Sequence, residues 1–156
     1  FRQVDASGQS QVPQSRILSR TQETPDAHVR QALNLTEHDA TIRLERLRLI
    51  NGRPLFHEQI WLPAAQFGAL LDTDLNDFGT LLYPFYEERC GMRVASARET
   101  LTVTSADEPL AATLGVSAGS PVVVVERVAL GYDRHPLEYR LSRGAADTFR
   151  YQVEIC

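Results

Sequence analysis

The sequence has only two cysteines, Cys90 and Cys156, and neither has a CxxC or Cys/His spacing typical of a structural zinc site. We therefore expect two free thiols, as in the reducing cytoplasm, and no metal or other cofactor. Long hydrophobic runs are also missing, since the longest covers residues 122–125. A membrane helix needs about 20 apolar residues, so we expect a cytoplasmic chain with no membrane partner.

Basic residues are fewer than acidic residues in this sequence. The chain has 16 Lys and Arg residues against 20 Asp and Glu residues, which gives a formal net charge of −4. A domain that binds nucleic acid normally carries a net basic face. We therefore expect that this chain does not bind DNA by itself.

Catalytic motifs are missing as well. The sequence has no GxSxG nucleophile motif, no HExxH zinc motif and no glycine-rich phosphate loop after a predicted strand. The four histidines are scattered, and Cys90 at a predicted helix end is a poor nucleophile because the helix dipole disfavours a thiolate there. The residues therefore give little support for an enzyme.

The length of 156 residues suits one domain, and 43% hydrophobic residues can form a core. Residues 1–16 are rich in Gln and Ser and show no apolar period. This composition predicts a linker or N-terminal arm, followed by a domain at residues 17–156. Because residue 1 is Phe rather than Met, we expect the chain to be cut from a longer protein.

Apolar periodicity and turn residues predict hairpins with helices between them. Thr24-Pro25-Asp26 is typical of a helix start, and residues 105–108 match a capping box. This order favours an α+β fold, an antiparallel sheet of about six strands with flanking helices. The predicted strands are 41–50, 55–62, 94–104, 122–130, 137–142 and 149–155, and the predicted later helices are 63–71, 80–90 and 105–115.

A weak internal repeat accompanies the predicted hairpins. Glu45-Arg-Leu47 leads through a turn to Pro54-Leu55, and Glu126-Arg-Val128 leads through a turn to Pro136-Leu137. The spacing differs by one residue. Two related hairpins in one sheet would explain this repeat, and chance similarity is the alternative.

The first predicted hairpin carries an unusual pattern. Strand alternation places Arg46 and Arg48 on one face with Ile42, Leu44 and Ile50. Arginine is costly to bury alone, so an inward face would bring a carboxylate or an anionic ligand to the guanidinium groups. The alternative is an outward face, or arginine stems that cover a sheet edge.

Glu58 has a similar setting on the second strand, and its partner depends on the hairpin register. A three-residue turn would place Glu58 opposite Arg46, whereas a two- or four-residue turn would place them on opposite faces. Glu138 follows the second turn, where it could also be an ordinary surface residue. Thr80 lies at the start of a predicted helix, and helix starts favour anions. The alternative is that Thr80 serves only as the helix cap. Arg98 and Arg127 lie on strands, where cross-strand pairing with Glu is the common role.

Several short motifs follow one another along residues 17–155. The first-hairpin motifs are Leu44-Glu-Arg-Leu-Arg48, Asn51-Gly-Arg-Pro54 and residues 58–63. The later motifs are Thr80-Leu-Leu-Tyr83, Glu87-Glu-Arg-Cys-Gly91, Ala111-Ala-Thr-Leu-Gly-Val116, Gly119-Ser-Pro121, Val125-Glu-Arg127 and Pro136-Leu-Glu-Tyr139. No single motif is specific, but their order and spacing resemble the UTRA domain of the HutC branch of the GntR family of bacterial transcription regulators.

The resemblance implies a chorismate-lyase-like fold that binds a small, anionic metabolite as effector, between the sheet and a flanking helix and loop. It also implies a homodimer, with DNA bound only through a winged-helix domain that this chain lacks. Carried over by position, the effector-binding residues are Arg46, Arg48, Glu58, Thr80 with its neighbour Leu81, Arg98 and Glu138.

The sequence departs from the sugar-phosphate-binding members of this family. Arg143-Gly-Ala-Ala-Asp147 lacks their tyrosines, and the segment from Thr80 to its glycine is one residue longer. The resemblance therefore does not name the effector. Two rival functions stay open, a chorismate-lyase-like enzyme and a dimerisation module with a vestigial pocket.

Overall fold

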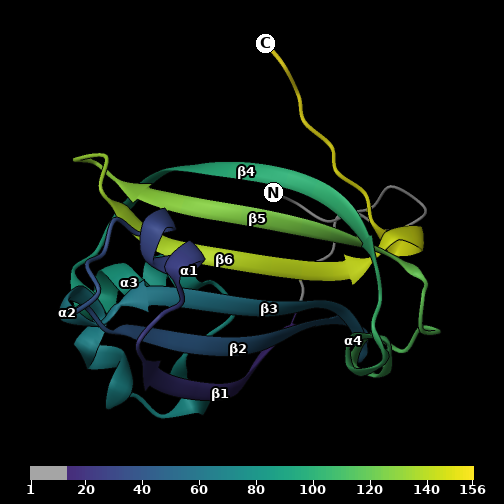
Figure 1. The fold of residues 1–156 in the computed structure, drawn as a ribbon, viewed down its shortest axis with the longest axis horizontal. Coiled ribbons are helices and arrows are strands. Elements are labelled where there is room, and N and C mark those ends of the chain that lie inside the picture. The colour runs from purple at the N-terminus through teal and green to yellow at the C-terminus, as the bar shows by residue number, and fades with distance from the viewer. Residues whose placement is uncertain (1–13) are drawn as a thin grey trace.

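Six strands form one antiparallel sheet, in the order β1-β2-β3-β6-β5-β4 (Figure 1). The computed structural model describes residues 14–156. Each strand pairs antiparallel with its neighbours, and β3 and β6 pair at the centre. The strands are β1 (Gln14–Glu23), β2 (Thr41–Ile50), β3 (Arg53–Pro63), β4 (Val94–Ser105), β5 (Pro121–Gly131) and β6 (Pro136–Ala145).

Short helices lie on both faces of this sheet (Figure 1). The helix α1 (Ala27–Ala32) covers one face, and α2 (Ala64–Phe67) and α3 (Leu82–Cys90) lie on the other. The helix α4 (Glu108–Leu114) connects β4 to β5 at one end of the sheet. Three 3-10 turns complete the chain: η1 (Gly68–Leu71), η2 (Leu75–Asp77) and η3 (Ala146–Thr148).

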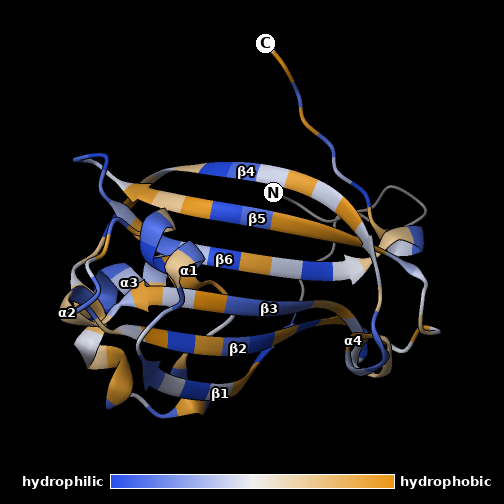
Figure 2. Cartoon of the chain, viewed as in Figure 1, coloured by the Kyte–Doolittle hydropathy of each residue, from blue (hydrophilic) through white to orange (hydrophobic). Residues whose placement is uncertain are grey.

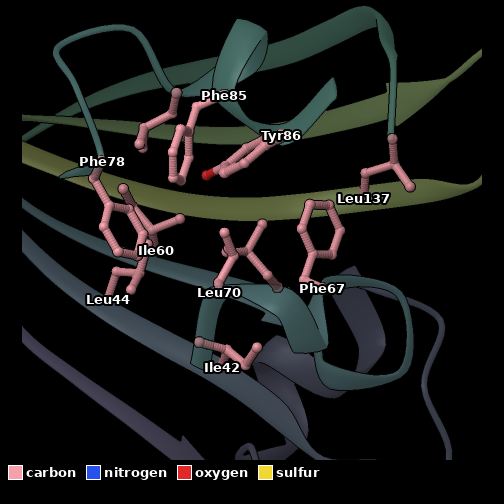
Figure 3. Close-up of a cluster of buried hydrophobic side chains, with 11 residues drawn as sticks. Ile42, Leu44, Ile60, Phe67, Leu70, Phe78, Phe85, Tyr86 and Leu137 are labelled. Carbon is pink, nitrogen blue, oxygen red and sulfur yellow. The ribbon is translucent and has the colours of Figure 1, made fainter. Parts of the chain in front are cut away.

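The larger core lies between the sheet and α3 (Figure 3). Strand alternation turns the aliphatic side chains of β2 and β3 to this face, where they meet aromatic residues from α2, α3 and the loop between them. Figure 2 shows this alternation as successive blue and orange positions. Buried members of the core include Ile42, Leu44, Ile60, Leu62, Phe67, Leu70, Phe78, Phe85 and Tyr86.

A smaller core lies under α1 on the opposite face, where Val29 and Leu33 pack against Trp61 and Tyr139. Because both faces are covered, β3 and β6 carry buried side chains on each side. Polar residues that point inward from these strands must therefore find partners inside the protein.

The internal repeat corresponds to two related hairpins. The turn between β2 and β3 consists of Asn51 and Gly52, whose φ angles of 53° and 74° suit a tight hairpin turn. The pairing shifts by one residue after Arg48 in this hairpin and after Ala129 in the hairpin of β5 and β6. Arg48 and Ala129 hold the same place in the repeat, so the two hairpins share one bulge position.

The segment at residues 149–155 does not form the predicted strand. It follows η3 as an extended tail, and Val153 and Ile155 are 56% and 89% exposed. Alternation alone does not make a strand, and no strand pairing within the described residues includes residues 149–155. The prediction of a sixth strand at this end is therefore wrong, and the sixth strand is β1.

The sequence pattern does not predict β1, because its side chains are mostly polar and its burial is weak. Residues 14–16 belong to this strand rather than to a linker, and the rest of the expected arm lies outside the described residues. Two helices also begin at other residues than predicted. The caps are Asp26 and Asp107, whose carboxylates accept hydrogen bonds from the amides of Val29 and Leu110.

Cys90 and Cys156 are free thiols. Within residues 14–156, no group of three His, Cys, Asp or Glu side chains is placed to hold a metal ion. No helix over the same residues has the length and apolar character needed to cross a bilayer.

Gly144 on β6 is a packing requirement that can be tested. A Cβ atom there would lie 2.7 Å from both the carbonyl oxygen of Leu55 and the ring of Phe56, whereas one on Gly68 would meet nothing within 4 Å. We expect Gly144→Ala to lower the free energy of unfolding by about 1–3 kcal/mol, since the backbone must shift. Gly68→Ala is the control and should be neutral or slightly stabilising. Urea unfolding compares them, and equal stability of both variants would contradict the tight packing.

Candidate functional site

Four guanidinium groups surround a pocket of about 250 Å³ between the sheet and the start of α3. Arg46 and Arg48 come from β2, Arg127 from β5 and Arg140 from β6. Residues 80–84 form the opposite wall. We call this the arginine pocket. Arg46 is 1% exposed and Arg48 is half-buried, so the arginine-bearing face of β2 is turned inward.

The register of the first hairpin brings Glu58 opposite Arg46. A two-residue turn alone would have separated the two side chains onto opposite faces. The bulge beyond Arg48 adds one residue to β3 and restores the pairing. Arg46 Nε donates to Glu58 Oε1 at 2.7 Å. The turn length and the bulge together therefore have the same effect as the three-residue turn that the sequence left open.

A hydrogen-bonded network forms the floor of the arginine pocket. Ser142 Oγ donates to Glu58 Oε2 at 2.6 Å, and Arg140 Nη1 lies 4.0 Å from the same oxygen. Arg140 also donates through Nε and Nη2 to the two oxygens of Glu138, both at 2.8 Å. The hydroxyl of Tyr86 donates to Glu138 Oε2 at 2.5 Å. Glu58 and Glu138 are thus buried partners of arginines beneath the pocket.

The surroundings of Glu58 hold it ionised. Burial alone would raise the pKa of Glu58, but the charges of Arg46, Arg140 and Arg48 and the hydrogen bond from Ser142 lower the pKa to about 2. Burial and the neighbouring Glu138 raise the pKa of Tyr86, so its hydroxyl keeps its proton and remains a donor. Glu58 therefore remains an acceptor for the arginines, and Tyr86 remains a donor to Glu138.

Arg127 has its own carboxylate partner. It forms an ion pair with Glu99, which lies directly opposite on the neighbouring strand β4, with Arg127 Nη2 2.9 Å from Glu99 Oε2. Its Nη1 donates to the hydroxyl of Tyr83 at 3.1 Å. The cross-strand role predicted for Arg127 is confirmed.

Arg48 is the exception among the four arginines. Its Nε is buried and has no hydrogen-bond partner, and no ion pair includes its guanidinium group within the described residues. Burial lowers the pKa of Arg48 to about 10. The charges of Arg46, Arg140 and Arg127 also lower this pKa, whereas the charge of Glu58 raises it. Arg48 therefore stays positive at neutral pH but has no carboxylate of its own.

The start of α3 adds a second feature that favours an anion. The helix begins at Leu82 rather than at Thr80. Its N-cap residue is Leu81, whose apolar side chain accepts no hydrogen bond from the helix amides. The carbonyl of Thr80 instead accepts a hydrogen bond of 3.4 Å from Arg46 Nη1. Thr80 and Leu81 thus line the pocket as expected, but the amides at the helix start lack a side-chain cap.

Arg98 does not lie at the arginine pocket. Adjacent residues of a strand point to opposite faces, and Glu99 is the one that faces Arg127. Arg98 lines a separate hollow of about 390 Å³ beside α1, together with His28 and Glu126. The assignment of Arg98 by position is therefore wrong for this pocket.

Sequence reasoning missed Arg140, Ser142 and Tyr83. A signal for the first two existed, because Glu138, Arg140 and Ser142 alternate on one strand face much as Arg46 and Arg48 do. No periodic signal marks Tyr83, which reaches the pocket from the first turn of α3. Its ring lies 5.5 Å from the Arg140 guanidinium group, within range of a cation–π interaction.

Comparison with known proteins gives the family of the chain. The model of the UTRA domain family matches residues 8–150. The chain belongs to the UTRA domain family. It is an effector-sensing domain of the kind found in transcription regulators of the GntR family.

Curated relatives of this UTRA domain are transcription regulators. An HTH-type transcriptional regulator of Mycobacterium tuberculosis is 32% identical over 73 residues, which cover 47% of this chain and 27% of that protein. A protein of Escherichia coli K12, described as the probable transcriptional repressor of a fructoselysine utilization operon, is 24% identical over 105 residues. That match covers 67% of this chain and 42% of the relative, so the chain spans less than half of either curated protein.

Solved structures share the fold over nearly the whole chain. The ligand-binding domain of a protein assigned to the GntR family, from Bordetella bronchiseptica, has a TM-score of 0.81 and 26% identity. The alignment covers 92% of this chain and 89% of that one. The effector domain of PhnF from Mycobacterium smegmatis has a TM-score of 0.82 at 23% identity, covering 91% and 86% of the two chains. The six-stranded antiparallel sheet with flanking helices is thus the fold of these effector domains.

The pKa of Glu58 generates a prediction on acid stability. Because its pKa in the fold, about 2, lies below the ordinary value of 4.5, ionised Glu58 stabilises the fold above pH 4.5 and this contribution is lost as pH falls toward 2. Glu58→Gln removes the titration. Between pH 4.5 and 2, the wild type should lose on the order of 3 kcal/mol more unfolding free energy than this variant.

Urea unfolding followed by circular dichroism at several pH values measures this difference. Glu87→Gln is the matched control, because Glu87 pairs with Arg93 at the surface. It should keep the pH dependence of the wild type. Parallel pH curves for the wild type and Glu58→Gln would show that Glu58 does not titrate as the network requires.

Proposed function

We propose that this UTRA domain binds a small anionic metabolite in the arginine pocket. The observation that carries the proposal is Arg48, whose buried Nε has no hydrogen-bond partner and whose guanidinium group has no ion pair among residues 14–156, whereas the other arginines of the pocket have carboxylate partners. Four arginines face three glutamates there, Glu58, Glu99 and Glu138, so one positive charge is left over. An anion in the pocket supplies the missing acceptor and relieves the repulsion among the arginines.

The geometry favours a small anionic group. A pocket of about 250 Å³ is slightly smaller than the usual range for ligand sites, about 300–1,000 Å³. It can take a phosphate, a carboxylate or a similar headgroup, with the amides at the start of α3 as further donors. A larger ligand would extend past exposed Leu81 into solvent. Arg46, Arg48, Thr80 and Leu81 would contact the anion, and Glu58 and Glu138 would position arginines rather than touch it.

The binding event would act on DNA through another part of a longer protein. We propose that the domain works as a homodimer, and that effector binding favours one arrangement of an attached winged-helix domain. We also propose membership of the HutC branch, as the motif order suggests. Residues 1–156 alone should not shift operator DNA in a mobility assay, and a shift at moderate salt would contradict this division of roles.

A sensor is favoured over an enzyme because the relatives of this chain are transcription regulators. The buried carboxylates beneath the pocket are also engaged by arginines, Tyr86 and Ser142, so neither is placed as a free general base. Turnover of chorismate, followed by absorbance, would overturn this choice.

The role of Arg48 can be tested with Arg48→Gln. Without ligand the variant should be at least as stable as the wild type, because the change removes a partly buried charge that lacks a carboxylate. Inorganic phosphate, sulfate and a set of phosphorylated sugars and carboxylates serve as probes in thermal unfolding at constant ionic strength. A probe at a hundredfold excess over its Kd should stabilise the wild type by about 2.7 kcal/mol.

The stabilisation should disappear in Arg48→Gln and persist in Arg98→Gln, the matched control on the opposite face of the sheet. If no probe stabilises the wild type, the pocket is vestigial and the domain serves assembly alone. If Arg48→Gln responds like the wild type, the anion binds elsewhere.

A further inference from the structure

A second hollow lies on the face of the sheet opposite the arginine pocket. Its volume of about 390 Å³ is within the usual range for small-molecule sites, about 300–1,000 Å³. The helix α1 forms one wall, the turn that joins β5 to β6 forms another, and residues of β4 and β5 lie between them. Figure 1 shows α1 over the sheet near this turn. We call this the α1 hollow.

Glu126 supplies the α1 hollow with a negative charge in a fixed position. The hydroxyl of Tyr139 donates to Glu126 Oε2 at 2.8 Å. Because this bond uses the single hydroxyl proton, the contact of 2.8 Å between Tyr139 Oη and His28 Nε2 makes the histidine the donor. Burial and the hydrogen bond to Glu126 raise the pKa of Tyr139, so the hydroxyl keeps its proton. Both contacts of Glu126 within residues 14–156 use Oε2, and Oε1 is available to a ligand.

Two arginines supply the same hollow with positive charge. Arg98 comes from β4 and Arg134 from the turn after β5, and both residues are exposed. Among residues 14–156, neither guanidinium group takes part in an ion pair or a hydrogen bond. Guanidinium groups match carboxylates, which they bind through paired hydrogen bonds. The α1 hollow thus offers a ligand two cationic groups and one carboxylate oxygen.

The backbone of Arg134 has a conformation that favours glycine. Its φ angle is 68°, in the left-handed region, where residues with a side chain are uncommon. Backbone hydrogen bonds hold the turn, since Arg134 N donates to the carbonyl of Gly131 at 3.0 Å and Gly131 N donates to that of His135 at 2.9 Å. Strained positions of this kind cluster at binding sites. An arginine at a position that suits glycine indicates a role for its side chain.

We propose that the α1 hollow binds a free amino acid, whose carboxylate contacts Arg98 and Arg134 and whose ammonium group contacts Glu126. A plain anion would be repelled by Glu126, and a plain cation by the two arginines, so a zwitterion matches the charges best. Val128 and Leu130 line the hollow and offer apolar contact to the amino-acid side chain. The site is separate from the proposed effector site, because the hollow and the arginine pocket share no lining residue.

Isothermal titration calorimetry of residues 1–156 with the standard L-amino acids at neutral pH tests the proposal. At least one amino acid should bind. Two analogues of that amino acid, the acid without its amino group and the amide without its carboxylate, should each bind about tenfold more weakly or worse, since each loses a charge-assisted contact. Failure of every amino acid to bind, or equally tight binding of the acid without its amino group, overturns the proposal.

Three variants locate the bound amino acid: Arg98→Gln, Glu126→Gln and Arg134→Gly. Each should weaken binding by about tenfold or more, because each removes one charged contact. Arg134→Gly should fold as well as the wild type, since glycine adopts this φ readily. Asn51→Gly is the matched control, because Asn51 has a φ of 53° in the turn of β2 and β3, outside the hollow, and its change should leave binding intact. Unweakened binding in Arg134→Gly overturns the proposal.

Arg48→Gln separates this site from the arginine pocket. The variant should bind the amino acid as tightly as the wild type does, whether or not an anion binds in the arginine pocket. Loss of amino-acid binding in Arg48→Gln, with binding unchanged in Arg98→Gln, would place the amino acid in the arginine pocket and overturn the α1 hollow as its site.

Discussion

The buried ion pair of Arg46 and Glu58 is the constraint on which the rest of the sheet depends. Both side chains are almost without solvent contact, so each would be costly to bury alone. A slip of one residue between β2 and β3 would turn one of them to the other face and leave its partner uncompensated. The pair adds little net stability compared with an apolar pair, but it makes alternative registers unfavourable. It thereby fixes which side chains of β3 reach the pocket.

The sequence predicts most of the fold because strand alternation and helix caps are local signals. The hairpin of β2 and β3 follows from alternation and from Asn51-Gly52, and the cross-strand role of Arg127 follows from its strand position. The partner of Arg46 could not be predicted, because it depends on a bulge that no residue type marks. The tail and β1 were misjudged for one reason. Whether a segment becomes a strand depends on its pairing with a neighbouring strand, which is a property of the whole sheet.

The residues predicted on β2 and just before α3 lie at the candidate site, whereas Arg140 and Ser142 of β6 and Tyr83 of α3 were missed. Arg46, Arg48, Thr80 and Leu81 line one pocket, whereas Arg98 lies on the opposite face of the sheet. Effector-binding residues were transferred from the family by sequence position. Successive residues of a strand point to opposite faces, so a position alone does not give the face. Arg98 and its neighbour Glu99 therefore belong to opposite sides of the sheet, and only Glu99 faces Arg127.

The two related hairpins explain why so many arginines meet in one pocket. The position that Glu58 occupies after Pro54 is occupied by Arg140 after Pro136. Consequently Arg46 faces a carboxylate across the first hairpin, but Arg127 faces Arg140 across the second. Like charges directly opposite each other destabilise a sheet, and here each is offset by a glutamate elsewhere, Glu99 or Glu138. Among the described residues, this arrangement still leaves Arg48 without an ion pair, so the fold gives up stability at this pocket.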